Sequence, residues 1–256
     1  MKEIEIYKNK FDEYTNKYLL IEDKYAYNFK MKYSHTMRVL NIALEIAESE
    51  KLSDFEKKAV YLSALFHDIG RFKQYYKYKC FDDGITGSHA KMSVEILREE
   101  GWLDNLDNDL REIVLSSIDV HSDYKLNYSL DSILGKVSAI LRDADKLDGY
   151  FIVLEETKQY DLSVLDKSKL ISDEVKKSIV ENSCVKKKDI KFAEDRNLLM
   201  VALIFDINFK YSFEKIIYNK YIERLFQKMK KNDEMLSLKN ICIDYINTKA
   251  KEALDE

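Results

Sequence analysis

The sequence contains no proline, and only six of its 256 residues are glycine. Proline breaks helix interiors and shapes many tight turns, and glycine serves turns that other residues tolerate poorly. A chain this long without proline is therefore poorly suited to an architecture of short strands and turns. We predict an all-α protein with a buried apolar core, since 46% of the residues are hydrophobic.

Cysteine is also scarce. The three cysteines, Cys80, Cys184 and Cys242, are far apart and form no CxxC pair, which argues against a disulfide framework or a zinc ribbon. The N-terminal MKEIEIYKNKFDEY is too charged for a signal peptide, and the most apolar stretch, 198–205, is too short to span a bilayer. We therefore predict a cytoplasmic protein with no membrane partner.

An excess of positive charge is missing as well. The net charge is −4, and neither half of the chain is basic. Nucleic-acid binding depends on clustered positive charge, so no nucleic-acid scaffold role is predicted. The lysine run 186–188 is followed closely by acidic residues, and we interpret it as a solvated face.

Apolar residues recur at helical spacing along most of the chain. The pattern predicts an N-terminal covering helix within 2–20 and a second helix from Ser34. Ser53 and Glu56 form a capping-box signature that predicts a helix start, and Gly70 is expected to end this helix just after His67 and Asp68. Further helices are predicted after residues 88, 107 and 131, and in segments near 173–182, 196–230 and 236–254.

All four histidines, His35, His67, His89 and His121, lie in the helical first half of the chain, and His67 is followed directly by an aspartate. A carboxylate-rich segment, RDADKLD, follows at 142–148. Imidazole nitrogens together with carboxylate oxygens suit divalent manganese, iron, cobalt, nickel or zinc. Such an ion lowers the pKa of a bound water from about 16 toward roughly 7, producing a hydroxide that can attack phosphorus.

The ordered set of His35, the HDIGR segment at 67–71 and the ADK segment at 144–146 resembles the HD superfamily of metal-dependent phosphohydrolases, in particular stand-alone bacterial HD proteins. The resemblance covers roughly residues 30–150 and implies a helical bundle. It also implies one or two divalent transition-metal ions, the first of them held by His35, His67, Asp68 and Asp145. Asp143 is a rival for the last ligand, but the ADKL context favours Asp145.

His89 and His121 lie between the HD pair and the last aspartate, in GSHAKMSVEIL and SIDVHSD. Binuclear members of the family carry two additional histidines there, so the resemblance implies a possible second ion held by His89 and His121, with Asp68 as the bridge. The alternative is that these two histidines contact the substrate phosphate. The sequence leaves both open.

Cations near the predicted ligands are expected to stabilise charge on phosphate oxygens. We predict Arg38, Arg71 and Arg142 as substrate-binding residues, and Asp68, Arg71 and Lys146 as catalytic residues. An ion pair with a neighbouring carboxylate is the alternative for each cation.

The chain lacks the GYP motif of cyclic-di-GMP phosphodiesterases, because HSDYKLNY occupies that segment. The resemblance therefore implies a hydrolase that uses metal-bound hydroxide on a phosphomonoester or phosphoanhydride of a nucleotide or small phosphorylated metabolite. The alternatives are a binuclear phosphodiesterase of cyclic nucleotides or dinucleotides, and a non-catalytic nucleotide-sensing module.

Two regions are predicted from these patterns. Residues 1–160 would form the HD-type domain, and residues 161–256 a helical C-terminal extension packed on it. The extension, including FDINF at 205–209, is expected to shape the pocket or an oligomer interface.

Overall fold

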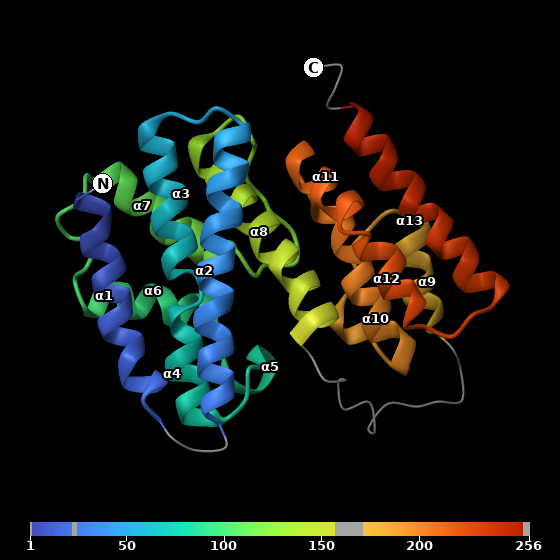
Figure 1. Ribbon diagram of the computed structural model, residues 1–256, viewed down its shortest axis with the longest axis horizontal. Coiled ribbons are helices and arrows are strands. Elements are labelled where there is room, and N and C mark those ends of the chain that lie inside the picture. Colours follow the sequence, from blue (N-terminus) through green and yellow to red (C-terminus); the bar gives the residue numbers. More distant parts are fainter. Residues whose placement is uncertain (1, 22–24, 157–170, 253–256) are drawn as a thin grey trace. The chain divides into compact units, whose positions relative to one another are not determined.

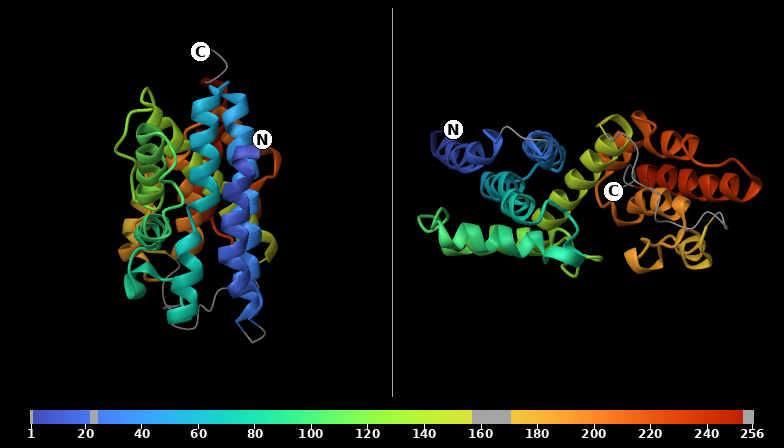
Figure 2. Two further views of the ribbon diagram at one scale, coloured as in Figure 1. Left: turned by 90° about the vertical axis from the view of Figure 1, so that its left-hand side faces the viewer. Right: turned by 90° about the horizontal axis from the view of Figure 1, so that it is seen from below.

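The computed structural model describes residues 2–21, 25–156 and 171–252. Helices dominate this part of the chain, which holds no β-strand, so the all-α prediction is confirmed (Figure 1 and Figure 2). No helix among the described residues is long and apolar enough to cross a membrane. The chain divides into two compact units, Met1–Ala144 and Asp145–Glu256.

The described residues of unit 1 form seven helices and the first part of an eighth, which runs across the boundary between the units. Their bounds are α1 Lys2–Leu19, α2 Ala26–Ser49, α3 Asp54–Phe66, α4 Ile69–Tyr78, α5 Asp83–Thr86, α6 His89–Glu99, α7 Asn108–Val120 and α8 Ile133–Phe151. Helix α2 packs along α3, α4 packs against α6, and α3 and α6 both contact α7. Helix α1 contacts α2, α3 and α4, as expected for a covering helix.

An aromatic cluster fills the core of unit 1. Phe11 on α1 meets Phe66 on α3 and Phe72 on α4, with ring centroids 6.4 and 6.2 Å apart. Phe29 on α2 stacks on Phe72, and Trp102 packs against Phe66. Each such ring stabilises the fold by roughly 1.5–3 kcal/mol when fully buried. The cluster therefore fixes the junction of α3 and α4, where the HD dipeptide lies.

The start of α3 is as predicted. Ser53 accepts a hydrogen bond from the Glu56 backbone NH, and Glu56 accepts from the Ser53 backbone NH and hydroxyl. Lys136 lies 3.0 Å from the other carboxylate oxygen of Glu56. The hydrogen bonds from Ser53, aided by Lys136, lower the pKa of Glu56 from 4.5 to about 2.

Replacing Glu56 with Gln is expected to lower the free energy of unfolding by up to about 1 kcal/mol at pH 7, because the charge that Ser53 and Lys136 stabilise is lost. The folded-state pKa is depressed, so this contribution is complete above the unfolded pKa and disappears as the pH falls toward the folded pKa. Urea denaturation should show the difference shrinking from about pH 4.5 down to about pH 2. A difference that stays constant over this range would contradict the assignment.

Gly70 does not end a helix, contrary to the sequence-based expectation. Helix α3 already ends at Phe66, and Gly70 is the second residue of α4. A Cβ at Gly70 would lie 2.5 Å from the His89 carbonyl oxygen and 2.7 Å from the Ser93 backbone nitrogen. Glycine is required there because α4 and α6 approach each other at the level of their backbones.

Unit 2 begins with the last residues of α8 and a π-helical turn, η1 Ile152–Glu156. Its other elements are α9 Asp173–Val180, η2 Lys187–Asp189, α10 Ala193–Val201, η3 Ala202–Asp206, α11 Lys210–Tyr218, α12 Tyr221–Gln227 and α13 Asp233–Glu252. The helical pattern at 196–230 is thus divided among several elements. Lys220, with a φ of 52°, separates α11 from α12.

The domain boundary predicted near residue 160 falls within 157–170, outside the described residues. It stays a prediction, as does the packing of the C-terminal extension on the first domain.

Candidate metal centre

The four histidines come from four helices of unit 1. His35 lies within α2, His67 and His121 are the C-cap residues of α3 and α7, and His89 is the first residue of α6. All four are at most 4% exposed. Their rings meet in pairs: the Nε2 atoms of His35 and His67 are 3.4 Å apart, and those of His89 and His121 are 3.0 Å apart.

Two of these rings are oriented by the helices that they cap. The Nδ1 atom of His67 lies 2.8 Å from the Ala64 carbonyl oxygen, and that of His121 lies 2.6 Å from the Ile118 carbonyl oxygen. A carbonyl oxygen only accepts hydrogen bonds, so Nδ1 carries the proton in each ring. Nε2 is then the ring nitrogen left to bind a metal ion, which is the arrangement typical of metal-binding histidines.

Asp68 lies among the imidazoles, with its two carboxylate oxygens on different sides. Oδ2 is 3.4 Å from His35 Nε2 and 3.8 Å from His67 Nε2, whereas Oδ1 is 3.3 Å from His89 Nε2. Burial alone would raise the pKa of Asp68, but the Lys32 ammonium and the His67 ring hold it well below its usual range. The carboxylate is therefore ionised.

Lys32 is a member of this cluster that the sequence analysis missed. Its Nζ lies 2.7 Å from Asp68 Oδ2, and only 15% of its side chain is exposed. Lys32 precedes His35 by three residues on α2, so the two side chains share a helix face. That spacing was the available signal, but lysine is so frequent in this sequence that it did not stand out.

The last predicted ligand, Asp145, is carried by α8 one residue beyond the boundary between the units. Ligand atoms of His35, His67 and Asp145 lie within 4.8 Å of one another, and so do those of His67, Asp68 and His121. These are the two groups with metal-binding potential among the described residues. Asp143 belongs to neither group and is fully buried.

The donor set fits a divalent metal ion. Imidazole Nε2 atoms face one another at hydrogen-bond distance, and an ionised carboxylate lies between the pairs. Facing lone pairs repel unless a proton or a cation lies between them. Mixed nitrogen and carboxylate ligands are those that divalent transition metals prefer.

Asp83 is a second residue that the sequence analysis missed. Its Oδ2 accepts a hydrogen bond from His89 Nδ1 at 2.6 Å, which directs His89 Nε2 toward Asp68. Burial would raise the pKa of Asp83, but the hydrogen bond from His89 and the Arg71 guanidinium hold it well below its usual range. Asp83 lies on the short helix α5, six residues before His89, and no local sequence pattern marks it.

Arg71 holds the segment that carries Asp83 in place. Its Nη1 donates to Gln74 Oε1, the Phe81 carbonyl oxygen and Asp83 Oδ1 at 2.7–2.8 Å. Its Nε lies 3.5 Å from Asp68 Oδ1. Arg71 therefore links the Asp68 carboxylate to the acidic partner of His89.

The other predicted cations have different surroundings. Arg142, 3% exposed, donates to the carbonyl oxygens of His121 and Asp123 and so holds the chain that follows α7. Lys146 pairs with Asp206 in unit 2 at 2.7 Å. Arg38 is half-buried on α2, one turn after His35. The predicted substrate-binding and catalytic roles of these residues stay predictions.

Replacing Asp83 with Ala is expected to weaken metal binding on the His89 side by about 10–100-fold, because the carboxylate that orients this ligand is lost. Titration of the metal-free protein with manganese or zinc in competition with a chelator measures this change. The control is Asp82→Ala, which removes the neighbouring cap of α5 but no contact to His89. If both variants lost the same metal affinity, the effect would come from a change in the folding of the segment around α5 and not from the lost contact to His89.

The comparisons with known proteins agree with this geometry. The HD domain family model matches residues 33–150, a span that holds the four histidines, Asp68 and Asp145. The comparisons with curated proteins and with solved structures gave no match. HD domains are helical, bind divalent metal ions and are generally hydrolases. Residues 33–150 of this chain match the HD domain family, as the order of its histidines and aspartates predicted.

Proposed function

We propose that this chain is a metal-dependent phosphohydrolase that cleaves a phosphomonoester or phosphoanhydride of a nucleotide or small phosphorylated metabolite. The observation that carries the proposal is the placement of Asp68, whose two oxygens face two separate pairs of imidazoles. A carboxylate placed in this way can bridge two cations.

The proposed ligands divide into two sets that share Asp68. His35, His67 and Asp145 would join it at the first ion, and His89 and His121 at the second. The ions, when bound, would activate water as a nucleophile near neutral pH and place positive charge beside a phosphoryl oxygen. Manganese, iron, cobalt, nickel and zinc all suit such ligands.

The chain itself would hold the substrate and orient the ligands. Arg71 and Asp83 fix the direction of His89, and Arg142 fixes the chain beside His121. Lys32 and Arg38, on the α2 face that carries His35, are the proposed contacts for phosphate oxygens. The catalytic role predicted for Lys146 would require its ion pair with Asp206 to open.

A phosphodiesterase acting on cyclic nucleotides or dinucleotides is the second candidate. The Nε2 atoms of His89 and His121 lie 3.0 Å apart, which favours this candidate because the two rings could bind a second ion together. The two candidates share the metal centre and differ in substrate.

The test begins with metal analysis of protein purified without chelators. The same protein, loaded in turn with each of the five metals, is then assayed against nucleoside mono-, di- and triphosphates, sugar phosphates, and cyclic mono- and dinucleotides. Phosphate release from the first groups supports the leading proposal, and cleavage of the cyclic compounds alone supports the second. Metal-loaded protein that binds a nucleotide without turning it over would instead support a sensing module.

A further inference from the structure

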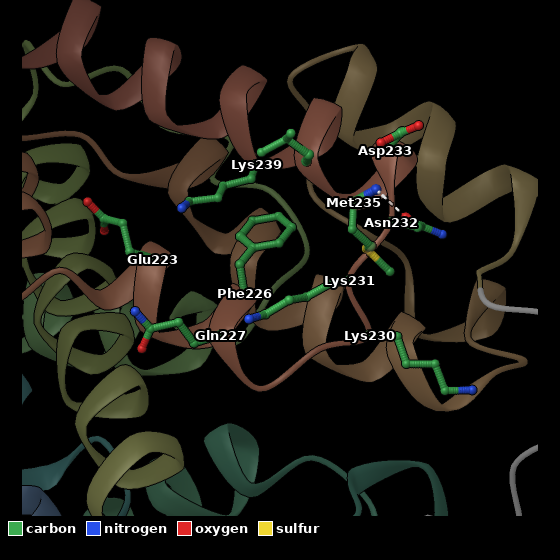
Figure 3. Close-up of a pocket in the computed structure, with 10 residues that line it drawn as sticks. Glu223, Phe226, Gln227, Lys230, Lys231, Asn232, Asp233, Met235 and Lys239 are labelled. Carbon is green, nitrogen blue, oxygen red and sulfur yellow. Dashed lines mark hydrogen bonds between the residues drawn. The ribbon is translucent and has the colours of Figure 1, made fainter.

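A cavity of about 490 Å³ lies in unit 2, between α12, the turn that follows it and the first turns of α13 (Figure 3). Small-molecule sites occupy about 300–1,000 Å³, so the cavity is large enough for a metabolite. All of its lining residues fall within 223–239, outside the HD domain at 33–150. The proposed phosphohydrolase reaction uses none of them.

The base of the cavity is apolar. Phe226 and Met235 are 7% and 3% exposed, and the Phe226 ring lies at the centre of the lining residues (Figure 3). The small exposed parts of this ring and this thioether give the cavity an apolar, polarisable floor against which a planar group can pack.

Positive charge surrounds this ring. Lys231 and Lys239 pass on either side of Phe226 and extend toward Gln227 and Glu223, while Lys230 points the opposite way (Figure 3). No carboxylate in the described part of the chain forms an ion pair with Lys231 or Lys239, so both ammonium groups are available to an anion.

At the N-terminus of α13, one backbone amide is already bonded by a side chain. The Asn232 side chain accepts a hydrogen bond from the Met235 backbone NH at 2.8 Å. The anion-binding character of the cavity comes from the two lysine side chains.

Glu223 requires a hydrogen-bond donor from the occupant of the cavity, whereas the lysines require an anion. Its Oε2 atom is buried and accepts no hydrogen bond from any described residue. A buried acceptor without a donor is unfavourable, and it is satisfied when a ligand brings an N–H or O–H group. The occupant should therefore carry an anionic group, a planar body and a hydrogen-bond donor.

We propose that unit 2 binds a phosphorylated nucleoside in this cavity, as a site separate from the metal centre. Lys231 and Lys239 hold the phosphate, the base packs against the exposed part of Phe226, and the base's amino group donates to Glu223. The site gives the protein a nucleotide response that does not depend on metal binding.

Calorimetric titration of the Asp68→Asn full-length chain in the presence of a chelator tests this proposal, because hydrolysis and metal-mediated binding are both suppressed. Wild-type protein in chelator is titrated in parallel. CMP and UMP are a matched pair, since CMP carries an amino group where UMP carries a carbonyl. We expect CMP to bind at one site, and UMP, cytidine and inorganic phosphate each to bind at least about tenfold more weakly. UMP lacks the amino group, cytidine lacks the phosphate, and inorganic phosphate lacks both the base and its amino group.

Variants of the lining residues complete the test. Lys231→Gln combined with Lys239→Gln should weaken CMP binding by at least about tenfold, whereas Lys230→Gln, whose side chain points away, should stay within about twofold. Glu223→Gln should remove the preference for CMP over UMP. The proposal is overturned if neither nucleotide binds, if the double lysine variant binds CMP normally, or if phosphate alone binds as tightly as CMP.

Discussion

Asp68→Asn is expected to lower kcat/KM by at least about 10³-fold, the scale of loss that follows removal of a group on which the reacting centre depends. The amide keeps the size of the side chain but loses the negative charge. Asp68 is the one carboxylate with oxygens facing both imidazole pairs, so both proposed ions lose a ligand at once.

Metal content provides a measurement that does not depend on the choice of substrate. When both are purified side by side without chelators, the Asp68→Asn protein should lack most of the metal that the wild-type protein binds. The control is Asp119→Asn on the exposed side of α7, which removes the same charge away from the site. Full metal content in Asp68→Asn would exclude the bridging role, and circular dichroism would show whether the variant is folded.

The clustering of the histidines was largely predictable because histidine is scarce in this chain. The chain has four histidines, and the structure brings all four to one place. The helical class followed from the absence of proline, and the start of α3 from a pattern only three residues long. Signals of this kind depend on neighbouring residues or on scarce residue types, so they can be recognised without knowledge of the tertiary fold.

The supporting contacts were not predictable, because their partners are distant in sequence or lie on the backbone. Arg71 was expected to bind substrate, yet its Nη1 holds Asp83 and the Phe81 carbonyl oxygen. Arg142 likewise donates to backbone carbonyls beyond α7. The contacts to backbone carbonyls have no residue-type signature, since every residue carries a carbonyl group, and Asp83 is twelve residues from Arg71.

Gly70 shows the same difference between local and tertiary information. Its position in the sequence predicts the end of a helix, whereas in the structure glycine is required because the backbone of α6 lies against it. The Gly70 NH donates to Ser93 Oγ at 2.9 Å, and the same hydroxyl donates to the His67 carbonyl oxygen at 2.7 Å. Gly70 therefore joins the helix that follows Asp68 to the helix that carries His89.

Gly70→Ala is accordingly expected to lower the free energy of unfolding by about 3 kcal/mol, the upper part of the range for overpacking a close contact. Helix propensity alone predicts the opposite sign, because alanine is more favourable than glycine in a helix by about 0.5–1 kcal/mol. The added Cβ would meet backbone atoms of His89 and Ser93, which no side-chain rotation can move away. Urea denaturation of the metal-free protein measures the change.

Gly149→Ala on α8 is the matched control. A Cβ at Gly149 would approach only Met200 Cε, at an ordinary 3.8 Å, so this substitution should be neutral or stabilising by up to about 1 kcal/mol. Separation of α4 from α6 would also displace His89, so Gly70→Ala should bind metal more weakly while Gly149→Ala binds it normally. If the two substitutions had equal effects on stability, the close approach of α4 to α6 could not be what requires glycine at position 70.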